Sequence, residues 1–141
     1  MKKIGLISAM VLILFITISA KMGNENWIYG GTSSENNVQE YAWYWANPCT
    51  KISDNVIEIE VGYNWTDAGR TRYVKPSNIR CTVYYIDFDL SIESYRERSS
   101  WDFDLNNVSG PEVLYPYGYD WNHVEPGTVA NEQLQIVKRF Q

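Results

Sequence analysis

The sequence predicts an α+β fold, a small antiparallel β-sheet of about five to six strands with a C-terminal amphipathic helix packed on one face. Three observations support this prediction. Apolar and acidic residues alternate in the middle of the chain, which is typical of strands with one buried and one solvated face. Turn-forming residues separate these segments. After Pro126-Gly127, the apolar residues instead recur at helical spacing.

The first two strands are predicted from aromatic residues. One strand begins at Trp27 and ends at Gly30-Gly31, and the Ser- and Asn-rich segment 32–37 is expected to form a turn. A second strand, 38–45, resumes the aromatic pattern. It is expected to end before Asn47-Pro48, because proline is poorly tolerated inside a sheet.

Alternation predicts the next strands. Segment 57–63 has the clearest pattern, with its isoleucines, valine and tyrosine on one face and its two glutamates facing water. Residues 67–69 are expected to form a turn. A long strand over 79–92 and another over 100–105 are expected to direct their acids, Asp87 among them, to solvent.

The C-terminal part of the chain has a different character. Segment 106–118 contains glycines and prolines and is predicted to be a long connection rich in turns. Segment 128–140 is predicted to be a helix with Thr128 as its N-cap, and Lys138 and Arg139 near its negative end. One apolar stripe on this helix is suited to covering the open face of the sheet.

Composition excludes several classes of protein. Aromatic residues make up 15% of the 141 residues, which argues against intrinsic disorder. The formal net charge of −5 argues against sequence-independent nucleic-acid binding, because such binding needs a basic surface. The chain length suits a single domain.

The N-terminus has the three parts of a secretory signal peptide. A basic start precedes an apolar stretch, and small residues follow at Ser19-Ala20. We therefore predict a signal peptide over 1–20, one domain over 21–141, and no membrane span after cleavage. The alternative is a retained anchor, because the apolar stretch is close to the shortest that can span a bilayer.

Export would place both cysteines in an oxidising compartment, so a Cys49–Cys81 disulfide is predicted. The alternative is two free buried thiols. No metal site is expected, because two thiolates and one distant histidine do not make a four-ligand set.

The sequence predicts no catalytic residue and no cofactor. His123 is the only histidine, and although Asp120 and Glu125 are near it, no nucleophile motif accompanies them. Paired aspartates, such as Asp87 and Asp89, could bind Ca²⁺ or act as acid and base, but strand alternation also explains them. A small secreted hydrolase that uses His123 and nearby acids is the outside alternative.

The unusual aromatic content indicates a candidate binding surface. Aromatic rings that are not fully buried favour interfaces. The candidate residues are Tyr115, Tyr117, Tyr119, Trp43 and Trp45. The alternative is that these rings seal a thin core.

The order of several short motifs resembles that of the bacterial surface-adhesin protein E-like family. The matching residues are Trp27, Tyr41, the strand 57–63, Cys81 with its preceding Asn78-Ile79-Arg80, Tyr95, and the closing segment from Trp121 to Thr128. Two departures are visible. Phe140 stands where the family usually has a second cysteine, so Cys81 must pair with Cys49 or stay free. The chain also lacks a lipid-acceptor cysteine.

The resemblance implies a small exported sheet with helical cover. Together with the composition, it suggests a non-enzymatic binding module of the periplasm, cell surface or medium, with a protein partner. An adhesin directed at host or matrix proteins is one version of this hypothesis. A periplasmic inhibitor or structural partner-binding domain is the alternative.

Overall fold

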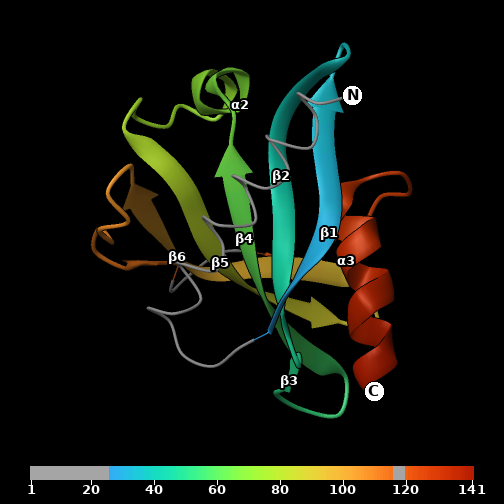
Figure 1. Cartoon of the computed structure of the whole chain (residues 1–141). Helices are drawn as coiled ribbons and strands as arrows, with labels where there is room; N and C mark the ends of the chain where they lie inside the picture. The colour runs from blue at the N-terminus through green and yellow to red at the C-terminus, as the bar shows by residue number, and fades with distance from the viewer. Residues whose placement is uncertain (1–25, 116–119) are drawn as a thin grey trace.

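The computed structural model describes residues 26–115 and 120–141. Within them, all eight strands join one antiparallel sheet with the order β1-β2-β4-β5-β6-β7, in which β3 also pairs with β4 and β8 with β6 (Figure 1). The strands are β1 (Asn26–Glu35), β2 (Val38–Asn47), β3 (Thr50–Lys51), β4 (Val56–Trp65), β5 (Ile79–Asp89), β6 (Ser94–Asp104), β7 (Val113–Leu114) and β8 (Asn122–His123). The predicted signal peptide, 1–20, lies outside the described residues.

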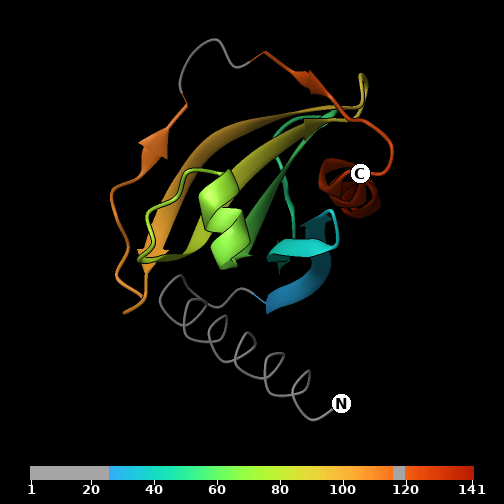
Figure 2. The same ribbon diagram turned by 90° about the horizontal axis from the view of Figure 1, so that it is seen from above.

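The sheet curls into a half-barrel, and the C-terminal helix α3 (Val129–Val137) lies at the inner, open side of the curl (Figure 2). A short 3₁₀ turn, η1 (Lys138–Phe140), follows it. Leu134 and Val137 of α3 are buried against the sheet. The antiparallel sheet with a C-terminal helix is thus confirmed, but the fold contains more sheet than the predicted five to six strands.

Strand β1 is longer than predicted because its glycines lie over a buried tryptophan. A Cβ on Gly30 would lie 2.3 Å from a carbon of the Trp43 ring, so only glycine lets the two strands pack this closely. The pairing with β2 shifts register between Tyr29 and Gly31, and β1 then continues to Glu35. The turn instead lies at Asn36 and Asn37, which have positive φ, as tight hairpins require.

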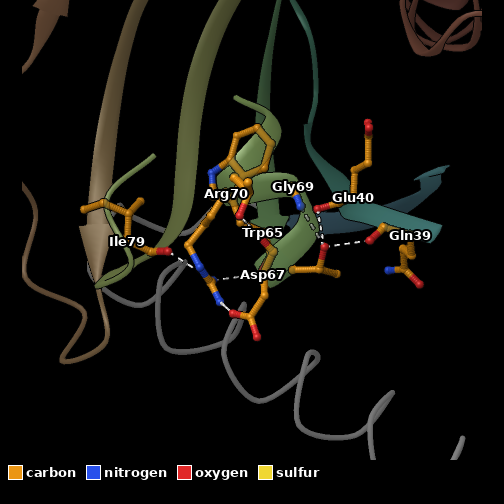
Figure 3. Close-up of polar contacts among 9 residues, drawn as sticks. Gln39, Glu40, Trp65, Asp67, Gly69, Arg70 and Ile79 are labelled. Carbon is orange, nitrogen blue, oxygen red and sulfur yellow. Dashed lines mark hydrogen bonds and ion pairs between the residues drawn. The ribbon is translucent and has the colours of Figure 1, made fainter. Parts of the chain in front are cut away.

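Helix α2 (Asp67–Arg72) replaces the turn predicted at 67–69. The Thr66 hydroxyl donates to the backbone oxygen of Gln39 at 2.6 Å and accepts from the Gly69 amide at 3.1 Å (Figure 3). A Cβ on Gly69 would lie 1.9 Å from the Glu40 carbonyl oxygen. The helix therefore forms where Thr66 meets the start of β2, a contact between segments far apart in the sequence.

Both faces of the sheet bury side chains. The larger cluster, on the concave face, includes Trp43, Ile59 and Phe88 together with the apolar residues of α3. The smaller cluster, on the outer face, consists of Ala42, Tyr44, Cys81, Val83 and Phe103, with Trp27 and Trp101 packed against it. The prediction that the strand acids face water is wrong for Glu60, which is buried, and for Asp87, which is fully buried because Arg96 and Arg98 of the adjacent strand contact it.

The predicted Cys49–Cys81 disulfide is absent, and both cysteines are free and buried. Cys49 belongs to the concave cluster and Cys81 to the outer cluster. The residue after Cys49 pairs with Glu58, whereas Cys81 pairs with Asn64. At about 3.3 Å per residue, this separates the cysteines by well over 10 Å along β4, and a disulfide requires Cα atoms within about 7 Å. Burial raises the pKa of the Cys49 thiol to about 12.

Candidate functional site

The concave face of the sheet and helix α3 enclose a cleft of about 540 Å³. Strand β1 forms one wall, and the segment from β8 to α3 forms a second wall. The floor comes from the four central strands. The lining residues of the floor are Tyr41, Tyr63, Ile86, Tyr95 and Glu97, and those of the second wall include His123, Glu125, Gly127, Ala130, Glu132 and Gln133.

A row of tyrosines crosses the floor. The rings of Tyr41 and Tyr63 stack with centroids 4.4 Å apart, and Tyr84 follows at 5.1 Å from Tyr63. Tyr73, which ends α2, meets Tyr41 edge-on at 6.1 Å. Burial raises the pKa of Tyr41 to about 12 and that of Tyr63 well above its usual value. These phenols therefore keep their protons at neutral pH.

Helix α3 is anchored to this row by a buried amide. Gln133 is only 1% exposed, and its Nε2 donates to the Tyr63 hydroxyl at 2.9 Å. The start of the helix is held by Thr128, whose Oγ1 accepts from the Asn131 amide at 3.2 Å, so the predicted N-cap is confirmed. The cap and the amide together set how far the helix stands from the floor.

The charged groups of the cleft are acids. Glu97 lies half-buried on the floor, and Glu125 and Glu132 lie exposed at the rim. Burial raises the pKa of the Glu97 carboxyl, while nearby Lys75 acts in the opposite direction. Lys75 itself is bonded to Asp102 at 3.1 Å. No lysine or arginine of the described residues lines the cleft.

Two residues of the aromatic binding surface predicted from the sequence, Trp43 and Trp45, are buried, so the prediction is wrong for them. Trp43 is 0% exposed and Trp45 is 6% exposed, because both point into the concave cluster. Tyr115 is half-buried, and its hydroxyl lies 3.1 Å from Ser100 Oγ. Tyr117 and Tyr119 lie outside the described residues.

The histidine of the outside alternative does lie at the cleft. His123 and Glu125 both line it, but Asp87 and Asp120 do not. Sequence reasoning missed the residues of the floor, Tyr41, Tyr63 and Glu97 above all. Their positions on alternating strands marked them only as core or solvent residues, and no short-range motif indicates that they share a cavity.

Known proteins add no assignment. No family model, no curated protein and no solved structure matches this chain. The resemblance to the surface-adhesin protein E-like family therefore stays a prediction. No helix among residues 26–115 and 120–141 has the length and apolar character needed to cross a membrane.

Proposed function

We propose that this chain is an exported, non-catalytic binding protein that holds its ligand in the cleft between the concave face of the sheet and α3. The observation that supports this proposal is the cleft itself. Its volume of about 540 Å³ lies in the range typical of small-molecule sites, and its floor of tyrosine rings with polar groups around it offers both apolar and hydrogen-bonding contacts.

Binding fits the cleft better than catalysis. Histidine-based hydrolysis needs a carboxylate that orients the imidazole and a nucleophile beside it. In the part of the chain that the structure describes, no side chain hydrogen-bonds to the His123 ring, which lies exposed at the rim. Asp87, one acid of the hydrolase alternative, is bonded to two arginines and is buried.

The two protein-binding roles stay hypotheses. An adhesin or a periplasmic partner-binding module would each use the cleft by holding a side chain of its partner there. Residues 1–20 support export through their signal-peptide pattern. The first test therefore addresses the site rather than the compartment.

The test is a ligand screen by ¹⁵N–¹H correlation spectra of the domain, with small molecules of neutral, anionic, cationic and apolar classes. Cleft ligands should shift the amides of Gly127, Ala130 and Gln133. Filling the cleft by Ala130→Trp, or from the other wall by Ser34→Trp, should abolish these shifts.

The matched control is Val113→Trp, on exposed strand β7, which should leave binding unchanged. Two cleft variants are used so that loss of folding in one does not decide the result. If no class of molecule shifts the cleft amides, or if both folded cleft variants bind normally, the proposal is wrong.

A further inference from the structure

We infer that the cleft takes a small organic cation, an ammonium or guanidinium group on a short apolar body. This inference rests on the proposed function, because it names the ligand class of the same site. Three features of the cleft support it: the sign of its charge, the hydrogen-bonding groups that it leaves without partners, and the spacing of its acids.

The charged side chains of the lining, on the floor and on the wall from β8 to α3, are negative. Glu97 supplies it from the floor, and Glu125 and Glu132 supply it from the rim. The one histidine in the lining is the only other residue there that could become charged near neutral pH. A concave site of one sign concentrates ions of the opposite sign, so an anionic ligand is disfavoured and a cation is attracted.

Three of the most strongly accepting groups in the cleft receive no hydrogen bond from the described residues. Gln133 uses its Nε2 on Tyr63, and its Oε1 receives no hydrogen bond from the described residues, although the side chain is 99% buried. The carboxylates of Glu97 and Glu132 likewise receive none from the described part of the chain. An ammonium has three donors and no acceptor, so it complements these groups.

An apolar ligand fits these groups less well. It would cover the half-buried Glu97 carboxylate without providing a donor, and a buried charged group left unpaired is costly. The tyrosine rings of the floor suit the apolar body of an organic cation.

The spacing of the acids favours an organic cation over a metal ion. Among the described residues, no three His, Cys, Asp or Glu side chains gather closely enough to hold a metal ion. Glu97 on β6 lies on the floor of the cleft, whereas Glu132 on α3 lies on a wall. Separated carboxylates suit a ligand whose charge and body extend through the site.

The test uses three molecules with the same hydrocarbon chain and different charge: hexylamine, hexanol and hexanoate. Calorimetry and the cleft amide shifts measure their affinities for the intact domain. We expect hexylamine to bind about tenfold tighter than hexanol, because hydrogen bonds to a charged group are about twice as strong as neutral ones. Hexanoate should bind weakest, and added salt should reduce the advantage of the amine.

Glu97→Gln should remove most of this advantage while leaving hexanol binding unchanged, and Glu132→Gln should reduce it less, because Glu132 is exposed. The matched control is Glu112→Gln, an exposed acid on the far side of β6 that does not line the cleft. Thermal melts of each variant establish that it is folded.

A blocked lysine and a blocked arginine distinguish the sources of the cation. Tighter binding of a blocked residue than of hexylamine indicates the side chain of a protein partner. Weaker binding indicates a free amine. Both results support the cationic class. If hexanol or hexanoate binds at the cleft as tightly as hexylamine, or if Glu97→Gln has no effect, this inference is wrong and the proposed binding site still stands.

Discussion

Two carboxylates on neighbouring strands, Asp87 and Glu97, have opposite surroundings. Asp87 on β5 is fully buried at the outer face, where Arg96 and Arg98 each approach its Oδ2 at 3.3 Å. Glu97 on β6 opens into the cleft at the concave face, among Tyr63, Tyr84 and Tyr95. The first carboxylate is neutralised inside the molecule, and the second is available to a ligand.

The Arg96-Glu97-Arg98 run explains this difference. Successive side chains of a strand point to opposite faces, so the two arginines reach the outer face and the glutamate between them reaches the cleft. The two arginines thus stabilise Asp87 on the outer face, and the glutamate gives the concave face a negative charge. Asp87, whose charge is balanced by two bonded arginines, therefore stabilises the fold. Glu97, to which no cation of the described residues is bonded, is left to bind a ligand in the cleft.

The largest expected effect concerns the cores of the two faces. Phe88→Ala should destabilise the fold by about 4 kcal/mol, and Phe103→Ala by about 3 kcal/mol, because deleting a buried ring leaves a cavity and Phe88 lies in the larger cluster. Urea unfolding of both variants measures the difference. A greater cost for Phe103→Ala would show that the outer cluster, not the concave one, is the main core.

The next effect compares the two carboxylates directly. Asp87→Asn should destabilise by about 2 kcal/mol, less than for a fully buried ion pair because both arginines are partly exposed. Glu97→Gln should change stability by less than about 0.5 kcal/mol, because no cation is bonded to it.

Denaturant unfolding at neutral pH checks both variants. A double-mutant cycle with Arg98→Gln then isolates the ion pair from the other effects of each substitution. An equal loss of stability for Asp87→Asn and Glu97→Gln would contradict the contrast between the faces.

The smallest effect is the pH dependence of stability. Burial raises the pKa of Glu97, so its contribution to stability is fully present below the usual pKa of 4.5 and is lost as the pH rises through the folded-state pKa. The Glu97→Gln variant should therefore not lose this part of its stability as the pH rises. The groups that face Glu97 are Tyr63, Tyr84, Tyr95 and Lys75, and none of these residue types normally titrates between pH 4 and 7.

Glu93 is the matched control, because its contribution to stability should change with pH in the opposite direction. Lys138 lies 2.8 Å from the Glu93 carboxylate and lowers its pKa, so the Glu93 contribution is present above pH 4.5 and is lost as the pH falls. Denaturant midpoints at several pH values should separate Glu93→Gln from Glu97→Gln in sign. The same sign in both variants would contradict the assignment of Glu97 to the half-buried floor of the cleft.

Much of the strand layout could be predicted locally. The alternation over 57–63 lies inside β4, and the helical spacing after Gly127 corresponds to α3 with its Thr128 cap. The errors fall where distant segments meet. Gly30 is in a strand because Trp43 packs on it, and Asp67 begins a helix because Thr66 bonds to Gln39.

The candidate site was less predictable than the strands. The sequence raised Trp43 and Trp45 as surface residues, whereas the structure buries both and places Tyr41 and Tyr63 in the cleft. Aromatic residues at alternating positions on one strand all point to the same face. Only the placement of α3 decides which of them are covered and which line a cavity.

The sequence by itself determined the central parts of the longer strands and the C-terminal helix, because side-chain periodicity acts between near neighbours and must match the geometry of the backbone. Only the tertiary structure decided that Cys49 and Cys81 stay apart, that Asp87 is bonded to two arginines while no cation of the described residues is bonded to Glu97, and that a cleft exists. These properties depend on sheet curl and strand register, which bring together residues that no local pattern connects.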